Sequence, residues 1–178
     1  MTNDTKPYTK LHPLSLFLTF GVGNIPFAPG TWGSLMALPI ACIAFLFFQQ
    51  DTAYVIISIL ILLFLALGTM AADRYMAANK VHDAKEIVID EVIGQLITLL
   101  MAAPFIGPEF HNTIQGIIMI LSCFVLFRFF DILKPWPVSW ADQKLHNGFG
   151  VMLDDVFAGI YAGIVFIIGF KLYEGFMV

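Results

Sequence analysis

Five apolar segments, separated by short polar stretches, constrain this 178-residue chain more than any other feature. A helix that crosses the hydrocarbon core of a membrane needs about 20 apolar residues. Only the second segment meets that length alone, so the others must draw on flanking residues. The chain is 12% charged, whereas soluble domains average about 25%. We therefore predict an all-α, polytopic membrane helical bundle of about five crossings, in a single domain over residues 1–178. The apolar segments are residues 35–48, 53–72, 92–104, 114–130 and 156–170.

The lysines and arginines predict the orientation of this bundle. Residues 49–52 and 105–113 are short connections, so neighbouring helices should be antiparallel. With the N-terminus in the cytoplasm, Lys171 is the one basic residue of nine that falls on the far side. Because positive residues are retained on the cytoplasmic side, we predict a cytoplasmic N-terminus and an external C-terminus. Most of the acidic residues fall on the cytoplasmic side as well, so we expect the chemistry at that face.

A glycine- and proline-rich stretch precedes the first crossing. Residues 21–35 contain four glycines and two prolines, a composition that does not form a regular spanning helix. We predict an N-terminal segment that re-enters the membrane or lies in its interface. Thr31 or Ser34 can cap the helix that follows, and the N-terminus of that helix would suit an anionic phosphate. A simple turn into a helix, with glycines for close packing, is an equally weighted interpretation.

Carboxylates at three predicted helix ends fall on the same face of the bundle, where we expect them to lie close together. Their packing would be unfavourable without a cation between them, and an all-oxygen ligand set favours a hard ion such as Mg²⁺. Arg128 and Lys134 could hold the remaining charge of a phosphate, which indicates phosphoryl transfer. Stabilisation of a helix N-terminus, and anchoring at the interface, are the structural alternatives for some of these charges. The carboxylates are Asp90, Glu91, Asp131, Asp154 and Asp155.

Several kinds of phosphatase and hydrolase are excluded by missing motifs. No cysteine is separated from a following arginine by five intervening residues, the spacing of thiol phosphatases, and no Asp-x-Asp-x-Thr or Asp-x-Asp-x-Val is present. A phosphate-binding loop that ends in Gly-Lys-Ser/Thr is absent, as is the Gly-x-Ser-x-Gly elbow of serine hydrolases. The two cysteines lie in apolar runs, where packing is their usual role.

Four motifs, in order along nearly the whole chain, closely resemble the phosphatidylglycerophosphatase A family. They are PFAPGTWGSL (residues 26–35), IVIDEVIG (87–94), FRFFDILKPWP (127–137) and GVMLDDVFAG (150–159). The resemblance implies a Mg²⁺-dependent hydrolase of the bacterial inner membrane, with its site facing the cytoplasm. Such an enzyme removes the terminal phosphate of phosphatidylglycerophosphate to give phosphatidylglycerol, in phospholipid biosynthesis. This lipid is the expected partner, and we expect neither a nucleic acid nor a protein partner.

The family's motif residues can be carried over to this sequence in three groups. As metal ligands we predict Glu91, Asp154, Asp155 and Asp131. As catalytic residues we predict Asp131, Asp155 and Asp90, with Asp131 or Asp155 as the general base. For the substrate phosphate we predict Arg128, Lys134, Thr31, Ser34, Gly30 and Gly33, and the family's glycine- and proline-rich segment also includes Pro29. Many members have proline after the aspartate at Asp83, where this chain has Ala84, so the roles of His82 and Asp83 stay open.

Alternatives remain for the mechanism and for the function. We expect direct attack by water activated at the metal, with an aspartyl-phosphate intermediate as the rival. Acids inside helices also occur in cation or proton transporters, but here no acids mark a path to the opposite face. A lipid-synthesising transferase would need a run of aspartates followed by Gly, Ala and Arg, which is absent.

Overall fold

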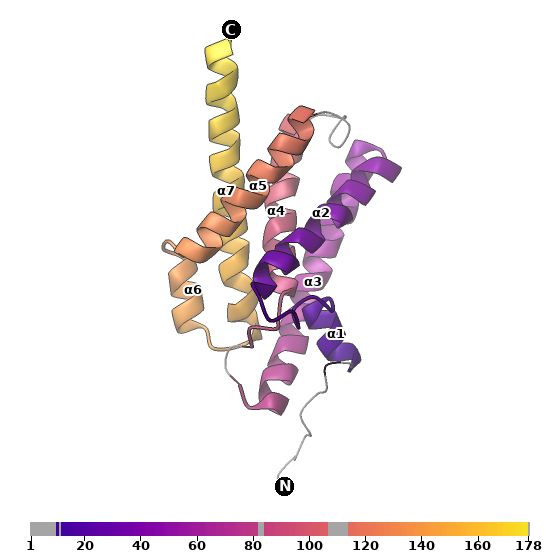
Figure 1. Cartoon of the computed structure of the whole chain (residues 1–178), viewed down its shortest axis with the longest axis vertical. Helices are drawn as coiled ribbons and strands as arrows, with labels where there is room; N and C mark the ends of the chain where they lie inside the picture. The colour runs from indigo at the N-terminus through magenta and orange to yellow at the C-terminus, as the bar shows by residue number, and fades with distance from the viewer. Residues whose placement is uncertain (1–9, 11, 82–83, 107–113, 178) are drawn as a thin grey trace.

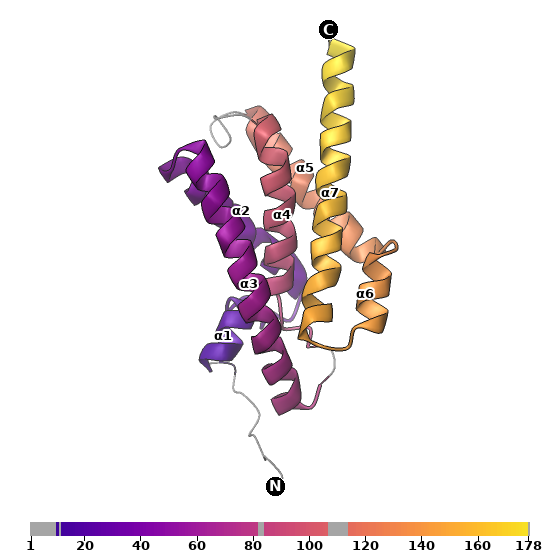
Figure 2. The same cartoon turned by 180° about the vertical axis from the view of Figure 1, so that it is seen from behind.

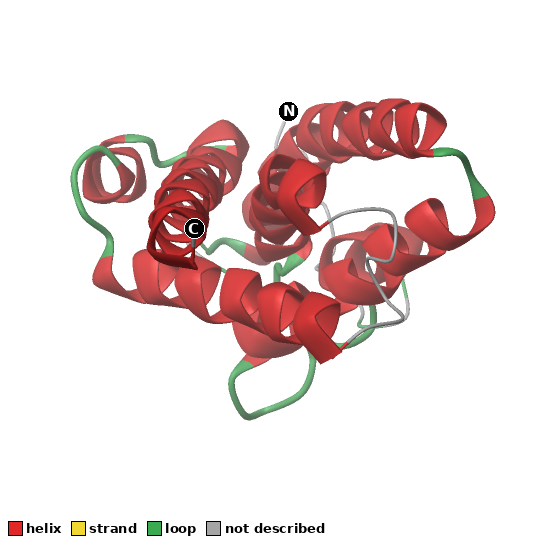
Figure 3. Cartoon of the chain, turned by 90° about the horizontal axis from the view of Figure 1, so that it is seen from above, coloured by secondary structure: helices red, strands yellow, loops and turns green. Residues whose placement is uncertain are grey.

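The computed structural model describes residues 10, 12–81, 84–106 and 114–177, and this part of the chain contains helices and no strands (Figure 3). Five of the helices are long and apolar enough to cross a membrane: α2, α3, α4, α5 and α7. The predicted all-α membrane bundle is therefore confirmed. The helices are α1 (Pro13–Thr19), α2 (Pro29–Phe47), α3 (Gln50–Asn79), α4 (Ile89–Ile106), α5 (Ile114–Leu133), α6 (Val138–Lys144) and α7 (Gly148–Met177).

Helix α4 is the centre of the bundle, and α2, α3, α5 and α7 all contact it (Figures 1 and 2). Of its most apolar 18 residues, 67% are buried, compared with 22% in both α3 and α5. Helices α3 and α5 also have the highest mean hydropathies, 2.7 and 2.2. A helix that is apolar on all sides yet mostly exposed is stable only in lipid. The outer helices thus shield α4 from lipid. The acids in the first turn of α4, Asp90 and Glu91, lie inside the bundle.

Small residues let α4 and α7 approach closely. A Cβ atom on Gly94 would collide with the carbonyl oxygen of Asp155 and with the Phe127 ring, and one on Gly159 would collide with the carbonyl oxygen of Gly94. Thr98 Oγ1 lies 3.1 Å from the carbonyl oxygens of both Gly94 and Gly159, so its hydroxyl ties the two helices together. Close backbone approach through small residues is a common way for membrane helices to associate.

The first crossing begins earlier than predicted. Helix α2 starts at Pro29, its N-cap is Ala28, and no side chain caps it, so the prediction that Thr31 or Ser34 caps this helix is wrong. Proline suits the first helical position because its φ is already helical and it has no N–H to satisfy. The irregular backbone is confined to the residues between α1 and Pro29. Gly33 lies inside the helix, where a Cβ atom would collide with Val88.

The last crossing is also longer than predicted, because α7 begins at Gly148. The Asp73 Oδ1 atom accepts a hydrogen bond from the Gly148 N–H at 2.6 Å, so α3 supplies the cap for α7. A Cβ atom on Gly150 would collide with the carbonyl oxygen of Leu145, which explains why glycine follows the turn. The short helix α6, which precedes this turn, was not predicted. It packs against α7 and brings a further acid, Asp142, to the site.

Candidate active site

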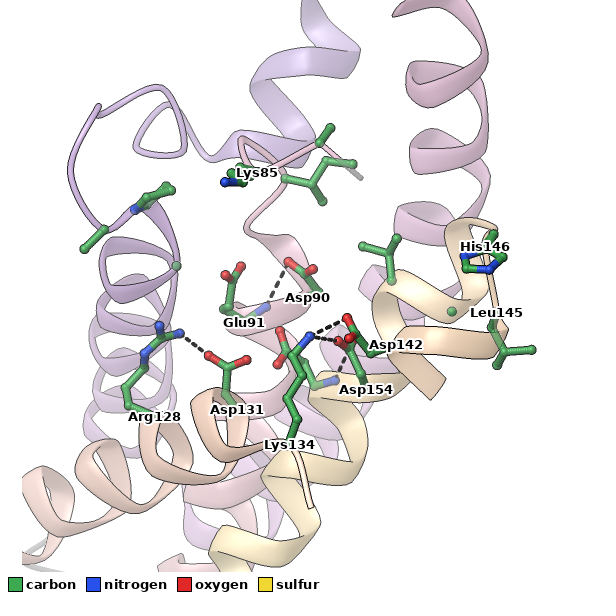
Figure 4. Close-up of a pocket in the computed structure, with 18 residues that line it drawn as sticks. Lys85, Asp90, Glu91, Arg128, Asp131, Lys134, Asp142, Leu145, His146 and Asp154 are labelled. Carbon is green, nitrogen blue, oxygen red and sulfur yellow. Dashed lines mark hydrogen bonds and ion pairs between the residues drawn. The ribbon is translucent and has the colours of Figure 1, made fainter. Parts of the chain in front are cut away.

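A polar cavity of about 370 Å³ lies at the end of the bundle where α2, α4 and α7 begin and α5 ends (Figure 4). All five predicted carboxylates line it, so residues from three distant parts of the chain are brought together as expected. Their individual roles remain predictions. The five are Asp90, Glu91, Asp131, Asp154 and Asp155.

Three of these carboxylates converge within the cavity. One oxygen from each of Asp90, Glu91 and Asp155 lies within 4.8 Å of the others. Asp90 and Asp155 are buried, with 8% and 3% exposure. Glu91 Oε2 and Asp155 Oδ1 are buried and have no hydrogen-bond partner among the described residues. Because unpaired buried charges are costly, this oxygen-only cluster fits a hard divalent cation such as Mg²⁺.

Arg128 lies beside this cluster in a fixed position. Its Nη1 atom is 2.6 Å from Asp131 Oδ2, one turn further along α5. The same Nη1 donates to Ser34 Oγ at 3.4 Å, and Ser34 in turn donates to the Gly30 carbonyl oxygen at 2.8 Å. A Cβ atom on Gly30 would collide with the carboxylate of Glu91 and crowd Arg128. Glycine therefore lets the first turn of α2, with its positive dipole end, reach the carboxylates.

Lys134 holds the other side of the cavity. It follows the end of α5 in a left-handed conformation, with φ of 45°. Its Nζ atom forms ion pairs with Asp142 and, at 3.0 Å, with Asp154 Oδ2. Burial lowers the pKa of Lys134, but the hydrogen bond to Asp142 and the charge of Asp154 outweigh this effect, so the pKa is raised overall. Asp154 is thus paired with a lysine, apart from the three-carboxylate cluster.

The predicted phosphate-binding residues of α2 are only partly placed at the cavity. Gly30 lines it, whereas Thr31, Gly33 and Ser34 do not. Ser34 lies beneath Arg128 and Gly33 packs against Val88. His82 and Asp83, whose roles were left open, are outside the described residues.

Three ionisable residues of the described lining were missed in the sequence: Lys85, Asp142 and His146. Asp142 stands eight positions after Lys134, and two prolines lie between them. The two residues are therefore not part of one predicted helix, and their spacing did not indicate a contact. Lys85 and His146 each lie within four residues of an acidic motif in the sequence, and this proximity could have indicated them. With Asp142 included, the described lining holds six carboxylates against three lysine or arginine side chains. This excess of negative charge is a second reason to expect a bound cation.

The fold and the cavity define a class of protein: a membrane-spanning helical bundle with an acid-rich polar site at one end. Residues 16–170 match the family described as Phosphatidylglycerophosphatase A, so the chain belongs to the phosphatidylglycerophosphatase A family and is a phosphatase. The resemblance identified from the four motifs is confirmed. Family membership also weighs against the transporter alternative.

Individual relatives agree with this assignment. The chain is 42% identical over 164 residues to Phosphatidylglycerophosphatase A of Haemophilus influenzae, with 92% of each chain covered. It is 37% identical over 155 residues to Phosphatidylglycerophosphatase A of Escherichia coli, covering 86% of this chain and 81% of the relative. A Bacteroides thetaiotaomicron protein, provisionally named a phosphatidylinositol-3-phosphatase, is 37% identical over 157 residues, with 86% and 90% covered. No solved structure matches the chain.

Proposed function

We propose that this protein removes the terminal phosphate of phosphatidylglycerophosphate in a Mg²⁺-dependent hydrolysis that gives phosphatidylglycerol. The observation that carries the proposal is the gathering of five carboxylates, Arg128 and Lys134 around one cavity. The chain covers 92% and 81% of two relatives that are named for this activity. The product places the reaction in bacterial phospholipid biosynthesis.

Asp90, Glu91 and Asp155 are the residues that would hold Mg²⁺, because their oxygens converge and two of those oxygens lack other partners. When bound there, the ion supplies charge neutralisation and polarisation of the phosphate oxygens. The earlier expectation included Asp131 and Asp154 as ligands. Both of these carboxylates are paired with a basic side chain, so we assign them other roles.

Arg128 and the first turn of α2 bind the terminal phosphate. A guanidinium matches the geometry of phosphate oxygens, and Asp131 and Ser34 hold this one in position. The N-terminal end of α2 adds a favourable dipole on the same side. Lys134 holds Asp154 and Asp142 together, so it shapes the wall of the cavity and adds positive charge beside the phosphate.

Asp131 accepts the proton of the attacking water. Asp131 is paired with Arg128, the proposed phosphate-binding group, and lies next to Asp155, so its carboxylate is placed to act on a water molecule beside the phosphate. The water oxygen forms a bond to phosphorus while the bond from phosphorus to the glycerol oxygen breaks. The departing alkoxide takes a proton from solvent at the cavity mouth, and inorganic phosphate and phosphatidylglycerol are released.

The site faces the cytoplasm, across the inner membrane from the C-terminus. Among the described residues, Lys171 lies near the far end of α7, while the other basic residues lie toward the end that holds the cavity. Retention of positive residues on the cytoplasmic side supports this orientation.

The test is phosphate release from phosphatidylglycerophosphate by the purified protein in detergent, with Mg²⁺ and with a chelator. Release should require the metal and should fall at least about 1,000-fold in Asp155→Asn, because a ligand and its charge are lost. Circular dichroism confirms that the variant is folded. Release that persists in chelator would contradict the metal dependence. Reduction with borohydride then tests for an acyl phosphate, and a labelled aspartate would contradict direct attack by water.

A further inference from the structure

We propose that Lys85 recognises the phosphodiester that joins the substrate's head group to its diacylglycerol. This inference rests on the proposed function and deepens it, because it concerns how the same cavity selects its substrate. It assigns a binding role to Lys85, which belongs to none of the four motifs.

The cavity is graded in depth. Asp90 and Asp155 are buried at its base, whereas Lys85, Asp142 and His146 are exposed at its mouth. Figure 4 shows Lys85 on the opposite side of the cavity from Asp131 and Lys134. Lys85 therefore lies at the mouth of the cavity, across from the side chains that hold its other wall.

The cations of the cavity are engaged to different degrees. Arg128 is paired with Asp131, and Lys134 is shared between two aspartates. Lys85 lines the same cavity but has no ion-pair partner within the described ranges. A positive charge at the mouth is thus available for a ligand.

The backbone that carries Lys85 is held firmly. Ala84 and Ile87, on either side of it, are buried with 5% and 4% exposure. The Ile87 N–H donates to the Ala84 carbonyl oxygen at 2.9 Å, and the Val88 N–H donates to the Leu18 carbonyl oxygen at 3.0 Å. The lysine stem therefore extends from a fixed turn between α3 and α4, so less conformational entropy is lost when its ammonium group binds.

The proposed substrate contains a second phosphate group that Lys85 can bind. Phosphatidylglycerophosphate carries a terminal phosphomonoester and, on the other side of its glycerol, a phosphodiester attached to the acyl chains. The monoester must reach the buried carboxylates, so the diester stays toward the mouth and the bilayer. A phosphodiester has one negative charge, which suits the compact ammonium group of a lysine. A lipid whose only phosphate is the monoester would not use this contact.

The experiment measures kcat and KM for phosphatidylglycerophosphate in mixed micelles for wild type, Lys85→Ala, Lys85→Arg and Lys144→Ala. Lys144 is an exposed lysine of α6 outside the cavity, so its variant matches the change in net charge. Loss of a partly exposed charged contact should raise KM about three- to tenfold in Lys85→Ala, with kcat within about twofold. Arginine should restore most of the affinity, and Lys144→Ala should match wild type.

A second measurement separates the diester from the terminal phosphate. Inhibition by inorganic phosphate reports on the deep subsite alone, so its inhibition constant should be the same in wild type and Lys85→Ala. If KM and this constant rise together, Lys85 contacts the terminal phosphate and the proposal is overturned. It is also overturned if Lys85→Ala and Lys144→Ala have equal KM values. Failure of the proposed function is distinct, because wild type would then release no phosphate at all.

Discussion

The two ends of the bundle use charged residues in opposite ways. At the cavity end, buried carboxylates meet between helices, and beside them Arg128 pairs with Asp131 and Lys134 with Asp154. At the far end, Lys171 and Glu174 pair at 2.9 Å on the outside of α7, with 61% and 49% of their side chains exposed. The far end also has a hollow of about 590 Å³ between α4, α5 and α7, but no acidic or basic side chain lines it among the described residues.

The space around the glycines also differs between the two ends of the bundle. At the cavity end, a Cβ atom on Gly30, Gly94 or Gly159 would collide with a neighbouring helix. On the far part of α7, a Cβ atom on Gly169 or Gly175 would meet no atom within 4 Å. Close backbone approach therefore accompanies the buried charges and is absent where charges face outward. The comparison teaches that the site depends on interhelical distance as much as on the acids themselves.

The largest expected effect comes from removing one carboxylate at each end. Asp131→Asn removes the proton acceptor while leaving its shape and a contact to Arg128, so kcat should fall about 100- to 10,000-fold. Glu174→Gln changes an exposed ion pair and should leave kcat unchanged. Steady-state phosphate release under saturating Mg²⁺ checks both variants. Equal activity in the two would contradict the role assigned to Asp131.

Added methyl groups provide the second test. Gly94→Ala inserts a Cβ atom against Asp155 and Phe127, and overpacking of this kind costs about 1–3 kcal/mol of stability. Gly169→Ala adds the same group in open space and raises helix propensity, so its stability should match or exceed wild type. Thermal unfolding in detergent measures both. A stable Gly94→Ala variant with full activity would show that the helices can separate without harm to the site.

The membrane fold was accessible from sequence because the length of the apolar segments can be read along the chain without knowing any tertiary contact. The gathering of the acids followed from topology, since Asp90, Asp131 and Asp154 belong to helix ends on the same side. Which of these acids pair with a basic side chain, and which converge as a candidate metal site, did not follow from topology. It depends on Asp142, which reaches Lys134 only because α6 folds back against α7.

The predicted starts of α2 and α7 were wrong for a related reason. Gly148 and Gly150 have low helix propensity, yet α7 begins there because Asp73 of α3 caps it. Gly30 and Gly33 likewise indicated a helix break but lie in the first turns of α2. Tertiary contacts override local propensity at these positions, and those contacts are not visible in the order of the residues.

The two lysine ion pairs give the third test. Lys134→Met leaves Asp154 and Asp142 without their shared cation, so activity should fall about tenfold, whereas Lys171→Met should change it little. Because the pKa of Lys134 is raised, its stabilising charge is fully present below the usual lysine pKa of about 10.4 and is lost only as pH rises above it. The activity difference between the variants should therefore be constant between about pH 7 and 9. A difference that disappears within that range would contradict the pairing.

The smallest expected effect compares two serines with the same local bond. Ser34 Oγ donates to the Gly30 carbonyl oxygen and Ser122 Oγ donates to the Ile118 carbonyl oxygen, each at 2.8 Å and four residues back in its helix. Ser34 alone of the two also accepts from Arg128, at 3.4 Å.

Ser34→Ala should therefore lower kcat/KM about three- to tenfold, the equivalent of one modest hydrogen bond, while Ser122→Ala keeps wild-type activity. Phosphate release at low substrate concentration measures this ratio. Because both substitutions remove the same bond within a helix, a deficit confined to Ser34→Ala isolates the positioning of Arg128. An equal deficit in both would instead assign the effect to the helices themselves.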